Sequence, residues 1–86
     1  MADEIHLTVV TPLKLVVYEQ VDEVVAPGEV GEFGVLPGHE PFVTTLKNGE
    51  LRYKKEGVEH KFTVEGGLAD VREDKVSILA DRVIED

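Results

Sequence analysis

The sequence contains no cysteine and no tryptophan. Without cysteine the chain cannot build a disulfide scaffold, a thiol nucleophile or a zinc–thiolate site, and this composition fits a reducing compartment. The aromatic residues are two tyrosines and three phenylalanines. Paired carboxylates serve glycosidases, but that reaction needs a cleft with aromatic walls. We therefore expect the eighteen acidic residues to lie on solvated strand faces and loop edges.

No apolar run approaches the ~20 residues that a membrane-spanning helix needs. The N-terminus, MADEIHL, carries early acids and no basic region, so we expect no signal peptide. Nine basic residues against eighteen acidic ones give a formal net charge of −9. Such a surface repels phosphate backbones and anionic lipids, which argues against nucleic-acid binding and against direct adsorption to a membrane.

Apolar and polar residues alternate with period two through most of the chain, and no window keeps the 3.6-residue period of a helix. The segments that alternate, or that are rich in β-branched residues, are 5–9, 13–26, 42–46, 50–54, 58–64 and 76–80. We expect 13–26 to form one long strand with a bend near Gln20. Only the tail ADRVIED, 80–86, could begin a helix.

The sequence therefore predicts an all-β fold, an antiparallel β-sandwich of two packed sheets with about 8–10 short strands. Its 86 residues suit a single domain, 1–86, with one small core. The apolar positions predicted to fill the space between the sheets are Ile5, Leu7, Val9, Leu15, Val17, Phe62, Val64, Val76 and Ile78.

Several dipeptides predict turns. Asn48–Gly49 is typical of a type I′ turn, and we expect it to pair 43–47 with 50–54 in a hairpin. Pro37–Gly38 suits a type II turn, since proline presets φ and glycine accepts a positive φ. Gly66–Gly67 predicts a bulge or a bend between the sheets. Further turns are expected at 27–28, 56–57 and 73–74.

The glycine- and proline-rich stretch GEFGVLPGHEPF, 31–42, raises the question whether His39 is catalytic. A general base needs an orienting partner and a nucleophile or substrate within hydrogen-bond reach. Glu40 is adjacent, but neighbours on an extended chain point to opposite sides. The single serine, Ser77, lies within a predicted strand and outside any GxSxG motif. We expect His39 instead to cap backbone groups of its turn or to contact a partner, and we predict no catalytic residue.

The remaining histidines and glycines do not predict a cofactor or metal site. We expect His6 on the polar face of its strand and His60 half-buried, and their spacing is not that of metal ligands. Gly28, Gly31 and Gly34 form a GxxGxxG pattern, but no helix or lysine follows it as a phosphate loop requires. We therefore expect no cofactor and no metal ion.

The segment GEFGVLPGHEPFVTTLKNGEL, 31–51, resembles the signature of the epsilon subunit of F-type ATP synthases, called delta in mitochondria. It contains a glycine-rich turn, a proline-glycine-histidine corner, a short strand and a leucine-lysine-x-glycine motif. The likeness extends to 5–31 and to VEGGLADVREDKVSILAD, 64–81. The resemblance implies a sandwich of two antiparallel sheets, which agrees with the fold predicted from the periodicity.

The resemblance also implies a function. In this family the N-terminal domain sits at the foot of the central stalk of a proton-translocating ATP synthase, binds the gamma subunit and the c-ring, and turns with them. It performs no chemistry, because the catalytic sites lie on other subunits. We accordingly expect a structural subunit of the rotor, peripheral to the cytoplasmic face of the bacterial inner membrane.

Carried over by position, the resemblance implies two sets of partner-binding residues. The set expected to face the c-ring, with Glu32 as its leading contact, is Glu29, Val30, Gly31 and Glu32. The set expected near gamma is Thr11, His39, Pro41 and Thr44. We also expect several of three apolar loop residues to be exposed in the free domain, namely Phe33, Val35 and Leu36.

Family members usually continue after the leucine-alanine-aspartate motif into a regulatory C-terminal helical hairpin. This sequence ends at Asp86, so we expect that hairpin to be absent from it. Residues 80–86 are similar to the approach to the hairpin, which favours a shortened chain over a naturally short family member.

A lipoyl or biotinyl carrier domain is the alternative from another functional class. Such domains are also small, acidic and all-β, and they present a modified lysine at the tip of a hairpin. Lys75 stands at the turn predicted for 73–74. Against this alternative, the carrier lysine lies mid-chain between similar groups of strands, whereas Lys75 lies near the C-terminal end.

Overall fold

The computed structural model describes residues 4–85. The strands are β1 (Ile5–Val10), β2 (Leu15–Val21), β3 (Glu23–Pro27), β4 (Glu32–Val35), β5 (Phe42–Thr45), β6 (Gly49–Lys55), β7 (Val58–Arg72) and β8 (Lys75–Ile84). None of the described residues forms a helix, so this part of the chain has no helix that could span a membrane.

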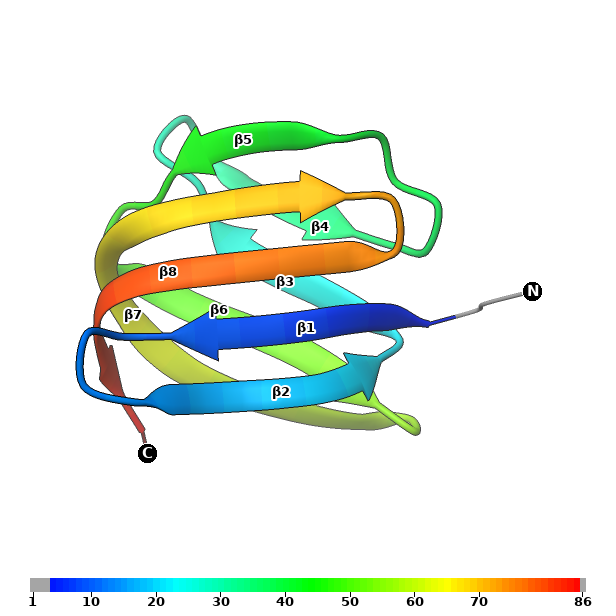
Figure 1. Ribbon diagram of the computed structural model, residues 1–86, viewed down its shortest axis with the longest axis horizontal. Coiled ribbons are helices and arrows are strands. Elements are labelled where there is room, and N and C mark those ends of the chain that lie inside the picture. Colours follow the sequence, from blue (N-terminus) through cyan, green and yellow to red (C-terminus); the bar gives the residue numbers. More distant parts are fainter. Residues whose placement is uncertain (1–3, 86) are drawn as a thin grey trace.

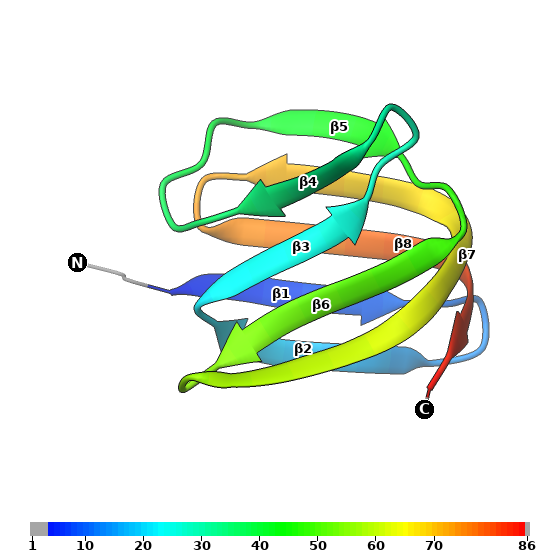
Figure 2. The same ribbon diagram turned by 180° about the vertical axis from the view of Figure 1, so that it is seen from behind.

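The eight strands form two facing layers, as Figure 1 and Figure 2 show from opposite sides. One layer has the order β2-β1-β8-β7-β5 and the other β7-β6-β3-β4, so β7 belongs to both. The all-β sandwich predicted from the sequence is confirmed. One pair departs from the antiparallel rule, because β1 and β8 run parallel.

Strand β7 is fifteen residues long and bends where it passes from one layer to the other (Figure 1). Gly66 and Gly67 lie at the bend with φ of 67° and 125°. Side chains other than hydrogen rarely tolerate such values. A Cβ on Gly67 would also lie 2.1 Å from the carbonyl oxygen of Leu79 on β8. The bend predicted at the double glycine is confirmed, and both conformation and close approach require glycine there.

Strands β5 and β6 lie end to end along β7. Their ladders with β7 share one continuous register, from Phe42 opposite Val71 to Lys55 opposite Val58. Residues 42–55 therefore follow β7 around its bend from one layer into the other. The two layers are tied together by this long, bent pair of strands.

The hairpin predicted at Asn48–Gly49 is wrong. Residues 43–47 do not pair with 50–54, and neither Asn48 nor Gly49 has the positive φ that a type I′ turn requires. Long-range pairing with β7 overrides the local turn signal. Gly49 serves packing instead, since a Cβ there would lie 2.9 Å from Cβ of Pro27 on β3.

Two other turn predictions are confirmed by the backbone. Glu56 and Gly57 both have positive φ, 52° and 80°, and they join β6 to β7 as a type I′ turn does. Gly38 has φ of 84°, and the His39 N–H donates to the carbonyl of Leu36 at 3.1 Å, which closes a type II turn around Pro37–Gly38.

The structure corrects the expectations for segment 13–26 and for the tail 80–86. The single long strand expected over 13–26 is wrong, because the segment divides at Asp22 into β2 and β3, which lie in different layers. Only the bend expected near Gln20 is confirmed, at Asp22. The helix expected to begin in 80–86 is wrong as far as Ile84, because β8 continues to pair with β7 up to Ile84 opposite Thr63. Asp86 lies outside the described residues.

The core lies between the two layers. All the predicted core residues are buried except Leu15, which is 54% exposed. The register shifts between Val9 and Val10, and this irregularity places Leu15 beside Val10 on the outer face. Burial of each fully buried aliphatic side chain, such as Leu51 or Ile78, contributes roughly 1.5–3 kcal/mol to the free energy of unfolding. The stability of this small domain therefore depends on a small number of such residues.

We expect Gly67→Ala to destabilise the domain by about 2–4 kcal/mol, because it adds an unfavourable φ and a clash with β8. Gly57→Ala is the matched control, since Gly57 has φ of 80° but open space around it. Urea unfolding followed by circular dichroism measures both. Equal losses in the two variants would contradict a role for close approach at the bend.

Candidate functional site

The β3–β4 turn carries the residues expected to face the c-ring. The Gly31 N–H donates to the carbonyl of Gly28 at 3.1 Å and closes the turn, and the Glu29 N–H donates to the carbonyl of Thr45 at 2.9 Å. The Thr45 hydroxyl also donates to the Glu29 carboxylate. Val30, at the tip, is 99% exposed. The turn is thus anchored at its base to the end of β5 while its apolar tip is uncovered.

Glu32 opens β4 and pairs with Arg52 of β6. Glu32 Oε2 lies 3.3 Å from Arg52 Nη1, and Arg52 also pairs with Glu50 at 3.3 Å and Glu59 at 3.5 Å. The hydrogen bond to Glu32, followed by that to Glu50, raises the pKa of the Arg52 guanidinium above its ordinary value. Arg52 is therefore already surrounded by carboxylates and is not available to bind a further anion.

The sequence did not predict the contact between Glu32 and Arg52. The two residues are 20 positions apart and meet only because β3 pairs with both β4 and β6. No local spacing rule relates them. Only the order of strands in the layer brings these side chains together.

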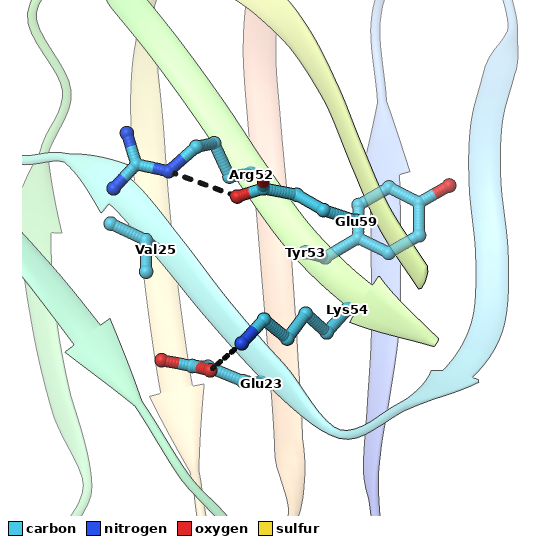
Figure 3. A pocket seen from close by; sticks show the side chains of 6 residues that line it. All are labelled: Glu23, Val25, Arg52, Tyr53, Lys54 and Glu59. Carbon is cyan, nitrogen blue, oxygen red and sulfur yellow. Dashed lines mark ion pairs between the residues drawn. The ribbon is translucent and has the colours of Figure 1, made fainter. Parts of the chain in front are cut away.

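Figure 3 shows a shallow hollow on the outer side of β3 and β6, lined by Glu23, Val25, Arg52, Tyr53, Lys54 and Glu59. The dashed lines join Arg52 to Glu59 at 3.5 Å and Lys54 to Glu23 at 3.9 Å. Each cation that lines the hollow is paired with an acid of a neighbouring strand. These pairs are solvated and screened, and the hollow has the character of a charged strand face.

Thr11, expected near gamma, begins the β1–β2 turn and closes it. Its N–H donates to the carbonyl of Lys14 at 2.9 Å, and its hydroxyl accepts from the N–H groups of Leu13 and Lys14 at 3.1 and 3.2 Å. Its side chain thus holds Leu13 in place, and Leu13 is 93% exposed. A partner at this turn would meet Leu13 before Thr11.

His39 and Pro41 lie in the connection between β4 and β5, and Thr44 lies in β5; these two strands face each other without pairing (Figure 2). The His39 ring lies 5.3 Å from the Phe42 ring, and its Nδ1 lies 2.7 Å from the carbonyl oxygen of Glu40. The Phe42 ring meets Phe33 edge-on at 5.0 Å. His39 thus bonds the backbone of its own loop, one of the two roles that the sequence left open.

The exposure expected for the apolar loop residues holds only in part. Leu36 is 58% exposed, Phe33 is half-buried against Phe42, and Val35 is buried. Val35 points inward because β4 alternates like any strand of a two-layer fold. Val35 therefore belongs to the core and is not available to a partner.

The structure does not gather the predicted gamma residues into one cluster. The β1–β2 turn, which begins at Thr11, lies at the same end of the sandwich as the β3–β4 turn, and the β4–β5 connection, which contains His39, lies at the opposite end beside the β7–β8 turn (Figure 1). The long dimension of the molecule is 33 Å. A single partner that contacts both residues must extend along most of this length.

An uncovered line of aliphatic side chains crosses the outer face of β2, β1, β8 and β7. Pairing places Leu15 beside Val10, Val10 beside Leu79, and Leu79 beside Leu68. Leu15 and Leu79 are more than half exposed, and the other two are partly exposed. We call these four residues the apolar row. Contiguous exposed apolar side chains of this kind mark interaction surfaces.

The sequence carries a signal for the apolar row that period-two alternation alone does not reveal. Val10 and Leu79 each follow directly after another apolar residue in a strand. Because successive strand residues point to opposite faces, one member of each such pair has to face outward. Consecutive apolar residues in an otherwise alternating strand therefore indicate an exposed patch.

The remaining histidines contact tyrosines. His60 is exposed and stacks on Tyr53 with 5.0 Å between ring centroids, so the half-buried position predicted for it is wrong. It lies near the β6–β7 turn, where β7 extends beyond the core. His6 is partly buried and meets Tyr18 edge-on at 4.4 Å. Residues 4–85 contain no group of three or more potential ligands placed to hold a metal ion.

Residues 4–86 match the family model described as the β-sandwich domain of the ATP synthase delta/epsilon chain. The chain belongs to this family. The resemblance stated for segments 31–51 and 64–81 is thereby confirmed over nearly the whole sequence.

Curated relatives give the same result. The ATP synthase epsilon chain of Geotalea uraniireducens is 51% identical over 81 residues, which cover 94% of this chain and 59% of that protein. The epsilon chain of Nitratidesulfovibrio vulgaris is 53% identical over 81 residues, again 94% of this chain and 60% of that protein. The chain thus spans 59–60% of the length of these relatives.

Solved structures share the fold. A chain in a cryo-EM structure of the Euglena gracilis mitochondrial ATP synthase, comprising OSCP, F1 and the c-ring, has a TM-score of 0.91 and 29% identity. The match covers 98% of this chain and 54% of that chain. A central-stalk and c-ring structure from Tetrahymena thermophila gives 0.80 at 15% identity, covering 94% and 66%, a likeness in fold alone.

The comparisons give the carrier-domain alternative no support. Lys75, the lysine that it requires, is the first residue of β8 and pairs with Arg72 across the turn and with His6 of β1. The backbone of Lys75 lies between β7 and β1, whereas a carrier lysine lies at the tip of its hairpin.

We expect Glu32→Lys to leave the fold intact, because Glu32 is exposed and Arg52 keeps Glu50 and Glu59 as partners. The midpoint of urea unfolding should move far less than in a Leu51→Ala variant, which removes a buried side chain at about 2–5 kcal/mol. A comparable loss in both variants would show that the ion pair is structural and that Glu32 cannot be used to test binding.

Proposed function

We propose that this domain is a non-catalytic part of the rotor of a proton-translocating F-type ATP synthase. It joins the gamma subunit to the c-ring and helps to couple rotation to ATP synthesis. The observation that carries the proposal is the match to the ATP synthase delta/epsilon family over residues 4–86. The bacterial relatives support a place at the cytoplasmic face of the inner membrane, where the domain is held through the complex.

The proposed contact with the c-ring is the β3–β4 turn. Its tip residue Val30 is fully uncovered, and Glu29 and Glu32 on either side give it negative charge. An apolar tip between carboxylates suits polar loops that carry basic groups, because charge complementarity orients the contact and selects the partner. Two hydrogen bonds between Glu29 and Thr45 anchor the base of the turn, which suits a contact that has to carry load.

The proposed contact with gamma includes the apolar row and the residues named from the family resemblance. Leu13, in the β1–β2 turn that Thr11 closes, is a further exposed apolar side chain. Burial of such a patch stabilises an interface by roughly 25 cal/mol per Å² of apolar area, before the costs of association. His39, Pro41 and Thr44 lie on the β5 side of the same layer.

A joint in a rotor has to transmit torque without slipping. In this domain the strands that carry the two proposed surfaces, β3 and β4 for one and β1, β2 and β8 for the other, are joined through the pairing of β6 with the bent strand β7. Sites on rigid strands and short anchored turns hold their geometry better than sites on flexible loops. The fold thus suits a mechanical coupling element.

We expect Glu32→Lys to weaken binding to the c-ring while leaving gamma binding unchanged. Glu50→Lys is the matched control, because Glu50 is also exposed and also pairs with Arg52 but lies outside the turn. Retention on immobilised Nitratidesulfovibrio vulgaris c-ring and gamma, measured separately, tests this. Equal retention of both variants on the c-ring would contradict the contact proposed for the turn.

We expect Leu79→Lys to weaken binding to gamma by at least about tenfold, since it places a charge within the apolar row. Gln20→Lys adds the same charge to the outer face of the same layer, away from the row, and should bind like the unchanged chain. If the unchanged chain binds neither gamma nor the c-ring, the proposed function as a whole is overturned.

A further inference from the structure

Asp74 lies in the β7–β8 turn with a positive φ of 61°. Apart from glycine, aspartate and asparagine are among the residues that tolerate this conformation best. The carbonyl oxygen of Asp74 accepts a hydrogen bond from the His6 N–H at 2.9 Å. The backbone of Asp74 thereby joins the β7–β8 hairpin to the beginning of β1.

The side chain of Asp74 reaches a third segment. The Gly38 N–H, at the corner of the type II turn in the β4–β5 connection, donates to Asp74 Oδ1 at 3.0 Å. Among residues 4–85 this is the one side-chain hydrogen bond that joins 36–41 to another segment. The two residues are 36 positions apart in the sequence.

The connection 36–41 has little else to hold it in one conformation. Leu36, Gly38, Glu40 and Pro41 are exposed, and the backbone turn is closed only within the loop, from His39 to Leu36. His39 follows Gly38 directly, so the position of the Gly38 peptide determines where the His39 imidazole lies beside the Phe42 ring. A hydrogen bond to a charged acceptor contributes more than one between neutral groups.

We propose that Asp74 is a positioning residue, whose carboxylate holds 36–41 in the conformation that presents His39 and Pro41 to gamma. The docking part rests on the proposed function, whereas the ordering of the loop does not. The β7–β8 turn alone does not require this carboxylate, because glycine satisfies a φ of 61° at least as well.

Two substitutions in the full chain separate the roles of Asp74. Asp74→Gly keeps the turn conformation and removes the acceptor. Asp74→Asn keeps both a tolerated φ and an Oδ1 acceptor and serves as the conservative rescue. The readouts are the amide exchange rate and chemical shift of Gly38 by NMR, urea unfolding, and the affinity for N. vulgaris gamma.

In Asp74→Gly we expect Gly38 amide exchange to accelerate and gamma affinity to fall, each by at least about fivefold, while the unfolding midpoint changes little. Asp74→Asn should restore part of both, because its Oδ1 accepts the hydrogen bond without the negative charge. Unchanged Gly38 exchange in Asp74→Gly would overturn the ordering role. Faster exchange with unchanged gamma affinity would overturn the docking role. If the unchanged chain does not bind gamma, the proposed function and the docking role both fail, and Gly38 exchange alone decides the ordering role.

Discussion

The fold depends on one strand that belongs to both layers. Strand β7 pairs with β6 on one side of its bend and with β5 on the other, in a single register. The bend is possible because Gly66 and Gly67 adopt positive φ and let β8 approach where a side chain would collide. A sandwich of this size buries a small core, so hydrogen-bonded continuity between its layers stabilises it where packing alone would be marginal.

This continuity has a mechanical consequence. In a sandwich of two separate sheets, the layers can shear against each other across the side chains of the core. Here the main-chain ladder itself passes from one layer into the other, so a force on the β3–β4 turn reaches the outer face of β1 and β8 through hydrogen bonds as well as through packing. Such a framework suits the proposed transmission of torque between two partners.

The two outer faces differ in character. The outer face of β3 and β6 carries alternating cations and acids paired at 3.3–3.9 Å, a pattern that favours solvent over a close partner. The outer face of β1, β2 and β8 carries the apolar row, which has no charge within it. The fold thus distinguishes a solvated side from a side that gains free energy when it is covered.

Most of the fold could be predicted from local patterns. Period-two alternation identified most of the strands, and eight of the nine residues predicted for the core are buried, but the core also contains residues that were not predicted, such as Val24, Val35 and Leu51. The turns or bends expected at Gly66–Gly67, Pro37–Gly38 and Glu56–Gly57 are confirmed. The same reasoning failed at Asn48–Gly49, because pairing with β7 outweighs a local turn preference, and at 80–84, where β8 continues beside β7. The motifs also identified the family.

What only the tertiary structure decided is which distant residues meet: Glu32 with Arg52, Asp74 with Gly38, and the members of the apolar row. Local patterns determine what each segment can form, since they act through backbone conformation. Contacts between segments depend on strand order and register, which emerge only when all the strands pair at once.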